Sequence, residues 1–304
     1  MTWWCTGVRW HAAGGPALCW YAHGRDPRES PLVYGTALAF RARGERRCLG
    51  VWRGGRRTPC PHGAGVPGRA TRAQCEECAR VDRAHSVAAD TFADDPRPYH
   101  VYVAWFGPGL VKVGITGVVR GGVRLLEQGA VAFSWLGRGP LMAARRAEEL
   151  LRTALGVPDR VPYGDKRAQR ARLPGADERA AEVARVHGDA LGLAGWPESL
   201  ERLPCRVVDH AERFGIDGVV AAGGVTGVVG ELTDGGAVVG TLVGAAGPDL
   251  HLSGGLVVDS RLLAGWRLEA WGDAGAGGEG AGARARAGVT VPVREIPAVQ
   301  GGLF

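Results

Sequence analysis

Lysine is nearly absent from this sequence of 304 residues, which contains Lys112 and Lys166 among 37 basic residues. The remaining basic residues are arginine, and they accompany 50 glycines. Joint enrichment in glycine, alanine, arginine and proline is typical of a GC-rich genome. We prefer this explanation to selection of arginine for bidentate hydrogen bonds to phosphate. The scarcity of lysine therefore does not by itself indicate a function.

Long apolar runs are also missing. No run approaches the roughly 20 apolar residues that a membrane span needs. The first residues, MTWWCTGVRWHAAGG, lack the charged region followed by an apolar region of a secretion signal. We therefore expect no membrane contact and a cytoplasmic location. In a reducing compartment, an odd count of seven cysteines favours metal ligands or buried thiols over disulfides.

The charge balance permits a polyanionic partner without requiring one. The formal net charge is +6 and the isoelectric point about 9.1. Summed attraction of this sign brings phosphate-rich partners to a surface. Excesses of this size are also common on inert surfaces, so the charge alone does not separate nucleic-acid binding from other functions.

Short strand patterns at both ends and helical patterns in the middle predict an α+β fold. The Gly-rich stretch after residue 205 reads as further short strands, typical of a barrel or bulged sheet. Low-complexity residues 273–288 predict a flexible segment, and VTVPVREIPA after them predicts one more strand. The expected organisation is a β-rich region with a cysteine cluster (1–95), a central domain (97–170), a helical connection (171–204), a β-rich domain (205–272) and a flexible tail (273–304).

Four of the seven cysteines lie within 31 positions and predict a metal site, with Cys75 and Cys78 forming a C-x-x-C pair where a helix begins. Two intervening residues let one turn present both thiolates to a single tetrahedral ion. Cys48 and Cys60 are the candidates for the other two ligands, and His62 competes for the place of Cys60. We predict a structural zinc ion. The single cysteines are expected to be small core residues: Cys5, Cys19 and Cys205.

Residues 99–155 predict a hairpin, a short helix, a third strand and a long helix. HVYVAWFG alternates as a strand, LVKVGIT returns as its partner, RGGVRLLEQ forms a helix and AVAFSWLG a strand. PLMAARRAEELLRTAL carries apolar residues at helical spacing, with Pro140 in the first turn, where it is tolerated. The expected order is β-β-α-β-α.

That order and its polar positions resemble the GIY-YIG nuclease superfamily. The resemblance places one tyrosine on the first strand, at Tyr102, and the closing glycine of the second motif at Gly114. The second tyrosine of the superfamily falls at Lys112, so one catalytic hydroxyl is missing. The chain is also similar to domain-of-unknown-function family 2797, from about Arg47 to Tyr163, most specifically at VKVGIT and EQGA.

The superfamily resemblance also implies an arginine on the first helix and a metal-binding glutamate on the second. Arg124 matches the arginine, with Arg120 as the alternative, and Glu148 matches the glutamate, with Glu149 next. If the site cleaves phosphodiesters, the resemblance implies magnesium or manganese held by the glutamate.

Two functions are consistent with these features. The first is a nucleic-acid-binding protein, for DNA or RNA, with a metal-dependent nuclease-like site at Tyr102, Lys112, Arg124 and Glu148. The second is a non-catalytic, zinc-stabilised scaffold that binds a protein or a small anionic ligand. A basic stretch at 164–175, GDKRAQRARLPG, is expected to be a solvated linker, with phosphate contact as the alternative.

Overall fold

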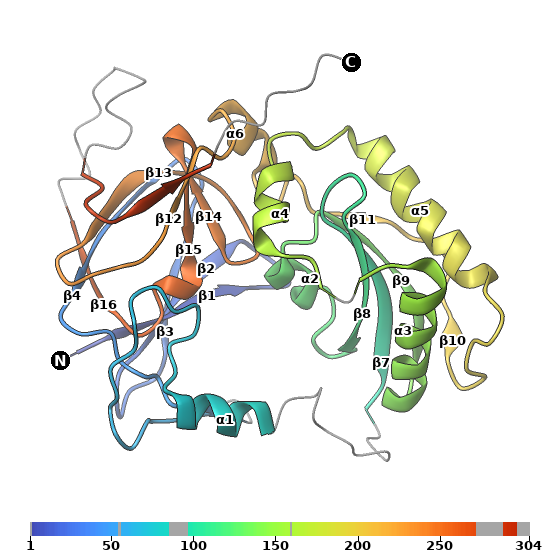
Figure 1. Ribbon diagram of the computed structural model, residues 1–304, viewed down its shortest axis with the longest axis horizontal. Coiled ribbons are helices and arrows are strands. Elements are labelled where there is room, and N and C mark those ends of the chain that lie inside the picture. The colour runs from blue at the N-terminus through green and yellow to red at the C-terminus, as the bar shows by residue number, and fades with distance from the viewer. Residues whose placement is uncertain (1, 54–55, 85–96, 159, 272–287, 297–304) are drawn as a thin grey trace. The chain divides into compact units, whose positions relative to one another are not determined.

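The computed structural model describes residues 2–53, 56–84, 97–158, 160–271 and 288–296. The chain divides into two compact units (Figure 1): unit 1 contains residues 1–90 and 221–304, and unit 2 contains residues 91–220. Helices and β-sheets together confirm the α+β class. Among the described residues, no helix has the length and apolar character needed to cross a membrane. The predicted flexible segment at 273–288 lies, up to residue 287, outside the described residues.

Unit 1 combines segments from both ends of the chain. Its N-terminal elements are β1 (Trp4–Trp10), β2 (Pro16–Tyr21), β3 (Arg28–Pro31), β4 (Ala37–Arg43), β5 (Val51–Arg53), β6 (Arg56–Thr58) and α1 (Glu76–Ala84). Its C-terminal elements are β12 (Gly227–Val229), β13 (Ala237–Ala246), β14 (Asp249–Leu252), β15 (Leu256–Asp259), β16 (Arg267–Ala270) and β17 (Val293–Glu295), with 3-10 turns η1 (Ser253–Gly255) and η2 (Ser260–Leu262). Strand β17 confirms the strand predicted in VTVPVREIPA.

The largest sheet of unit 1 has seven strands in the order β16-β4-β13-β14-β15-β12-β17. Strand β4 pairs antiparallel with β13 and β16, so an N-terminal strand lies between two C-terminal ones. Phe40 of β4 faces Val238 of β13 in the register, and both side chains are buried. The two β-rich regions expected at opposite ends of the sequence therefore share one sheet.

Arg46 ties the cysteine-bearing loop to the segment between β15 and β16. The residue is 1% exposed, and its guanidinium donates hydrogen bonds to five carbonyl oxygens, at 2.6–3.4 Å: those of Pro67, Gly68, Ala70, Arg261 and Ala264. Burial lowers the pKa of Arg46 to about 10, so the group is still charged at neutral pH. A buried cation is stable here because its donors are satisfied by backbone acceptors.

Unit 2 contains the central elements in the predicted order. They are β7 (Tyr99–Trp105), β8 (Val111–Gly117), α2 (Val123–Gln128), β9 (Ala132–Gly139), α3 (Leu141–Leu155), α4 (Tyr163–Gln169), α5 (Ala176–Gly192), β10 (Glu201–Arg202), β11 (Val208–Asp209) and α6 (Ile216–Ala221). The antiparallel sheet runs β10-β9-β7-β8, and β11 also pairs with β9. The β-β-α-β-α order of residues 99–155 is confirmed.

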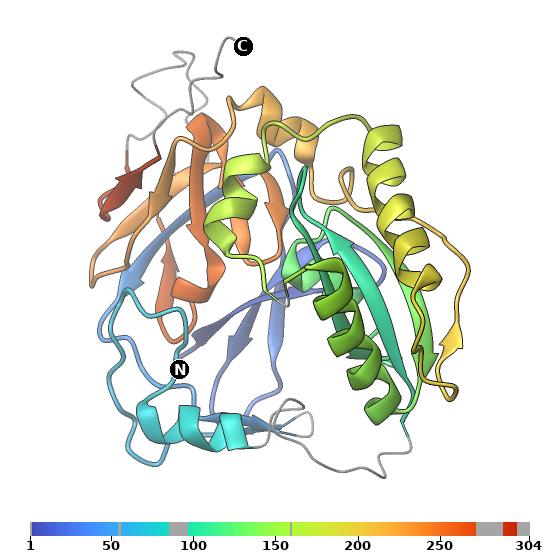
Figure 2. The ribbon, with the colours of Figure 1, turned by 45° about the vertical axis from the view of Figure 1, so that its right-hand side comes forward.

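The two faces of this sheet bury different residues. Helices α3 and α5 lie on the same side of strands β7 to β9 (Figures 1 and 2) and pack on Val101, Val103 and Trp105. Because side chains alternate along a strand, Tyr102 and Ala104 point to the opposite face. There they pack with Leu125 of α2 and other apolar residues. The second face is the one that carries the predicted catalytic tyrosine.

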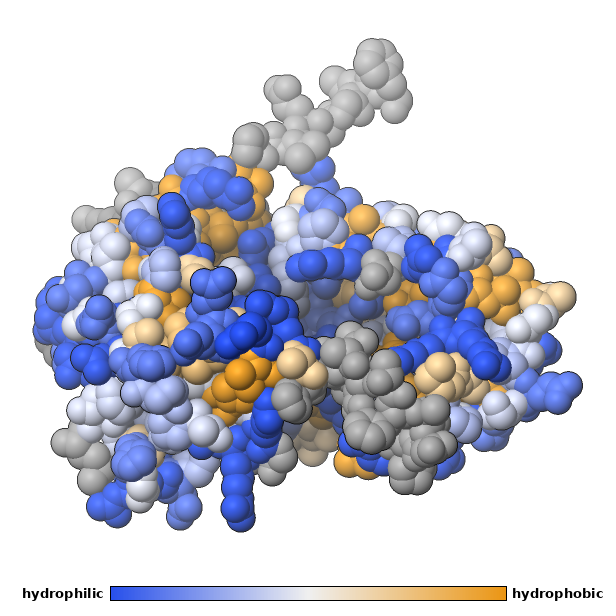
Figure 3. Space-filling view, turned by 60° about the horizontal axis from the view of Figure 1, so that its bottom comes forward, coloured by the Kyte–Doolittle hydropathy of each residue, from blue (hydrophilic) through white to orange (hydrophobic). Residues whose placement is uncertain are grey.

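The described surface is mixed in character. On the face drawn in Figure 3, hydrophilic and apolar residues alternate across the surface. The exposed large apolar side chains include Trp52, whose residue surface is 45% exposed, and Val119. Single exposed apolar residues are ordinary on soluble proteins, so Trp52 becomes informative only through its neighbours.

Candidate functional site

The four predicted cysteine ligands come together in unit 1. The sulfur atoms of Cys48, Cys60, Cys75 and Cys78 all lie within 4.8 Å of one another, and those of Cys60 and Cys75 are 3.8 Å apart. A tetrahedral site with metal–sulfur bonds of about 2.3 Å places its sulfur atoms about 3.8 Å apart. The cluster is therefore able to hold a metal ion.

Turns and a helix start position these ligands. The backbone N–H groups of Gly50 and Cys75 donate to the sulfur of Cys48 at 3.4 and 3.2 Å. Gly50 has φ +74°, and an added Cβ would lie 1.9 Å from the carbonyl oxygen of Thr58, so the turn requires glycine. Cys75 precedes α1, and Cys78 lies in the first turn of this helix.

The thiols differ in acidity. Burial acts to raise the pKa of Cys60, but backbone N–H groups of Ala64 and His62, with the thiols of Cys48 and Cys75, outweigh it and lower the pKa to about 6. Burial raises the pKa of Cys48 and of Cys78. Neighbouring thiols cannot all ionise in the absence of a compensating cation, because like charges repel. A bound metal ion supplies this compensation.

His62, the alternative to Cys60, is not part of the cluster. Its side chain is 63% exposed and its Nε2 lies 3.0 Å from Oε2 of Glu77. Of the three single cysteines, Cys5 and Cys19 are buried as predicted, whereas Cys205 is exposed and lies between short strands. The prediction of a core position for Cys205 is wrong. The apolar residues after it lead into β11, a strand of two exposed residues, and not into a buried strand.

Tyr102 stands at the centre of the second candidate site. It faces Gly114 in the β7–β8 register, and an added Cβ on Gly114 would lie 2.4 Å from the hydroxyl of Tyr102. The ring therefore lies over the glycine, and this close approach explains the glycine of the motif. Tyr102 is 2% exposed, and its hydroxyl accepts a hydrogen bond of 2.9 Å from Nε2 of Gln128.

The other predicted site residues lie near Tyr102 or act on its pKa from other elements. Nζ of Lys112 lies 5.8 Å from the centre of the Tyr102 ring. Burial raises the pKa of Tyr102, the Gln128 hydrogen bond and the charge of Arg124 oppose the rise, and Glu148 adds to it. Lys112 thus lies near the Tyr102 ring, and the charges of Arg124 and Glu148 act on the Tyr102 hydroxyl. The raised pKa keeps the phenol neutral, which is unfavourable for a general base.

Arg124 and Arg120, the two candidates for the helix arginine, share one acidic partner. Arg120 lies 2.5 Å and Arg124 3.6 Å from Oε2 of Glu127, and both arginine side chains are about half exposed. Both charges act on Tyr102. Each guanidinium can therefore reach a ligand in solvent while remaining near the site.

The two candidate glutamates differ in their surroundings. Glu149 is exposed and lies 2.6 Å from Arg152. Glu148 is half-buried on α3, and its charge adds to the raised pKa of Tyr102. Among the described residues, the cysteines form the one group of three or more metal-ligating side chains that lie together. A magnesium ion at Glu148 would therefore depend on phosphate and water for its other ligands, as this ion often does.

Aromatic and basic side chains extend the same sheet face. The rings of His100 and Trp135 stack with centres 4.4 Å apart, and Trp135 meets Tyr102 edge to face at 6.1 Å. Both His100 and Trp135 are partly exposed. Arg138 lies opposite His100 in the β7–β9 register. Burial lowers the pKa of His100, and the charge of Arg138 adds to this effect.

The basic stretch at 164–175 was expected to be a solvated linker, and this expectation is wrong. Helix α4 begins one residue before it, at Tyr163, and runs through its first half, and Lys166 is 3% exposed. Nζ of Lys166 donates to the carbonyl oxygen of Gln128 at 2.9 Å and lies 3.9 Å from the centre of the Phe106 ring. Arg170, fully buried, donates to the carbonyl oxygen of Gly129 at 2.8 Å. Both residues brace the turn after α2.

Charge patterning alone did not reveal these two residues. The available signal was spacing, since Lys166 and Arg170 are four positions apart and follow Tyr163, which places all three on one face of a helix.

These features define a mixed α+β protein with a four-cysteine cluster able to hold a metal. The family model for DUF2797, described as a protein of unknown function, matches residues 35–268. The chain belongs to this family. The match includes the cysteine cluster and the Tyr102 site. No curated protein and no solved structure matches the chain.

Proposed function

We propose that this protein binds nucleic acid through unit 2 and that its cysteine cluster holds a structural zinc ion. One observation carries the first part: cations and partly exposed rings gather on a single sheet face. Lys112 lies 5.8 Å from the Tyr102 ring centre, the charges of Arg124 and Arg120 act on Tyr102, and Arg138 acts on His100, which stacks on Trp135. Rings that stack on bases, combined with cations that contact phosphate, are the usual chemistry of single-strand recognition.

Zinc is the metal we assign to the cluster. A set of four cysteine thiolates in tetrahedral spacing is typical of structural zinc. Around the cysteines, the described residues form the three-residue strands β5 and β6 and helix α1. A core this small is stabilised when a metal ion binds ligands from several segments and so cross-links them.

Cleavage of a phosphodiester is the further activity that this site would support if a divalent ion binds at Glu148. The ion would be magnesium or manganese, and it would stabilise charge on the reacting phosphate. Tyr102, neutral and hydrogen-bonded to Gln128, would position Gln128 rather than take a proton. Binding is therefore the primary function that we propose, and cleavage is its extension.

The experiment measures binding of labelled single-stranded and double-stranded DNA and RNA by fluorescence anisotropy between 50 and 200 mM salt. Nucleic-acid binding weakens steeply over this interval because counterions are released. A non-catalytic scaffold for apolar partners would show no such binding. If none of the four probes binds at 50 mM salt, the proposal is wrong.

Cleavage has its own test. Glu148→Gln keeps the size of the side chain and removes its charge, so magnesium-dependent or manganese-dependent cleavage should disappear while affinity persists. Lys112→Tyr restores the second tyrosine of the nuclease motif and should raise cleavage if the site is an altered nuclease. If Glu148→Gln cleaves as fast as the wild type, Glu148 does not hold the ion.

A further inference from the structure

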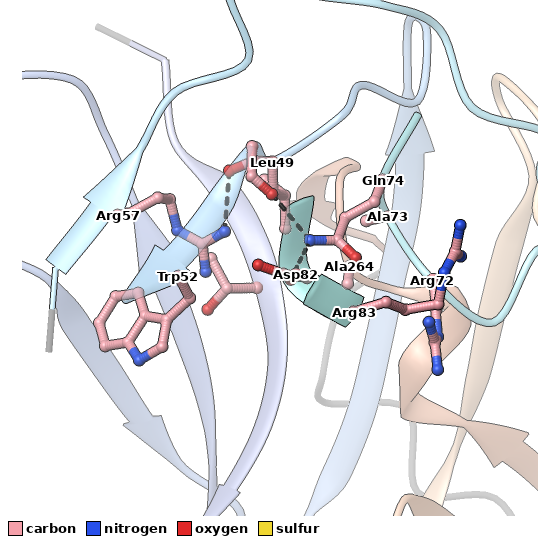
Figure 4. A pocket seen from close by; sticks show the side chains of 11 residues that line it. Leu49, Trp52, Arg57, Arg72, Ala73, Gln74, Asp82, Arg83 and Ala264 are labelled. Atoms are coloured by element: carbon pink, nitrogen blue, oxygen red, sulfur yellow. Dashed lines mark hydrogen bonds between the residues drawn. The ribbon is translucent and has the colours of Figure 1, made fainter. Parts of the chain in front are cut away.

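A pocket of about 410 Å³ lies in unit 1 and is not used by the proposed function (Figure 4). Its volume falls in the range of roughly 300–1,000 Å³ that small-molecule sites occupy. The segments that line it also carry the cysteines. Gly50 lies two residues after Cys48, Gln74 directly precedes Cys75, and Asp82 lies one turn after Cys78 on α1.

One side of the pocket offers a flat aromatic surface. Trp52 is exposed, and the guanidinium of Arg57 lies 5.4 Å from the centre of its ring. Arg57 is held in turn by a hydrogen bond of 2.9 Å to the carbonyl oxygen of Leu49. An exposed indole that is fixed in this way is suited to stack on a planar ring.

The middle of the pocket presents hydrogen-bond acceptors. Nε2 of Gln74 donates to the carbonyl oxygen of Gly50 at 2.9 Å and also to the carboxylate of Asp82. Both N–H groups of the amide are thereby used, which leaves its oxygen and the carboxylate as acceptors. A ligand ring seated against Trp52 should therefore carry N–H donors along its edge.

The opposite side is cationic. Figure 4 shows Arg72 and Arg83 together on the side away from Trp52, with Asp82 and Gln74 between them and the ring. Both arginines are exposed. Two guanidinium groups at the rim suit an anionic group such as phosphate, because their planar donors match its oxygens.

We propose that this pocket binds a guanine nucleotide. The base would stack on Trp52, its ring N–H and amino group would donate to Asp82 and Gln74, and its phosphate would lie between Arg72 and Arg83. Guanine is the common base that offers two adjacent N–H donors on one edge, one of them its amino group. The residues of this site belong to unit 1, whereas those of the proposed nucleic-acid surface belong to unit 2.

Calorimetric titration of the full chain with guanosine 5′-monophosphate tests this proposal. We expect one site per chain, with Trp52→Ala and Arg72→Ala each weakening binding about tenfold or more. Arg72→Ala should leave the weaker binding of guanosine, which lacks phosphate, unchanged. Arg69→Ala is the matched control, since Arg69 is an exposed arginine of the same unit that does not line the pocket.

The free nucleotide and the end of a nucleic-acid strand share this chemistry, and a second titration separates them. A 5′-phosphorylated oligonucleotide that begins with guanine is titrated into Arg124→Ala, which weakens the surface of unit 2. If the oligonucleotide binds more tightly than guanosine 5′-monophosphate, and Trp52→Ala abolishes this binding, the pocket binds strand ends. If the two ligands bind with equal affinity, the pocket binds the free nucleotide. Absence of guanosine 5′-monophosphate binding at millimolar concentration, or equal weakening by Arg69→Ala, overturns the proposal.

Discussion

Replacement of Arg124 by alanine should weaken nucleic-acid binding with little effect on stability. The side chain is 42% exposed, and its ion pair with Glu127, at 3.6 Å, is shared with Arg120. Exposed ion pairs contribute about 0–1 kcal/mol, so the melting temperature should change by only a few degrees. A charged hydrogen bond to phosphate is worth about 1.5–3 kcal/mol, which corresponds to a loss of affinity of roughly tenfold or more.

The salt dependence makes this prediction sharper. Each phosphate contact contributes about −0.7 for single strands, or −0.9 for B-DNA, to the slope of log K against log salt. Between 50 and 200 mM salt, the affinity ratio of wild type to variant should therefore shrink by about threefold. The assay is fluorescence anisotropy at four salt concentrations.

Arg185→Ala is the control for charge. Arg185 also forms an ion pair on a helix, at 3.1 Å from Asp189, and its side chain is 65% exposed. It lies on α5, which packs on the other face of the sheet. If Arg185→Ala lowers affinity and salt slope as much as Arg124→Ala, the effect reports net charge, and the assignment of Arg124 to a binding surface is refuted.

Three further predictions concern the metal, the packing at Tyr102 and pH. Cys75→Ser should release zinc, as measured by elemental analysis, and speed hydrogen exchange over residues 48–80, whereas Cys205→Ser should do neither. Gly114→Ala should cost about 1–3 kcal/mol of unfolding free energy, because the new Cβ would lie 2.4 Å from the hydroxyl of Tyr102; the loss should shrink when Tyr102→Leu is added. Burial lowers the pKa of His210 in the folded protein below the value near 6.5 of an unfolded histidine. The neutral imidazole therefore contributes fully to folding stability above pH 6.5, and this contribution is lost as pH falls through the lowered pKa. His210→Asn should flatten denaturant-measured stability between pH 7 and 5, and an unchanged pH dependence would contradict this account.

Local patterns predicted the elements of unit 2 well. Strand alternation in HVYVAWFG and helical spacing in residues 141–155 depend on neighbours in sequence, so β7 and α3 appear where they were expected. The close spacing of Cys75 and Cys78 likewise predicted a cluster that the structure brings together.

Long-range packing accounts for what the sequence did not reveal. Lys166 reads as a solvated charge until Phe106 and the carbonyl oxygen of Gln128, far from it in sequence, are seen to enclose its ammonium group. Arg46 is similar, since its acceptors include Pro67 and Arg261. Helical spacing indicates the face on which Lys166 lies, but the groups that enclose Lys166 and Arg46 are distant in sequence and cannot be predicted from neighbouring residues. The pairing of β4 with β13 joins residues about 200 positions apart and is equally invisible to periodicity.

This pairing has a consequence for how the chain is made. Because β4 is flanked by β13 and β16, the main sheet of unit 1 cannot close until the ribosome has delivered residues near 270. Unit 2, a continuous segment of the chain, can complete its own sheet earlier during synthesis, as domains generally fold as units. Strand β4 remains without its sheet partners until then. Contacts between residues so far apart in sequence also form slowly. Unit 2 can therefore fold before unit 1 does. The last strands to be synthesised complete the main sheet of unit 1, and the segment between its strands β15 and β16 anchors the cysteine-bearing loop.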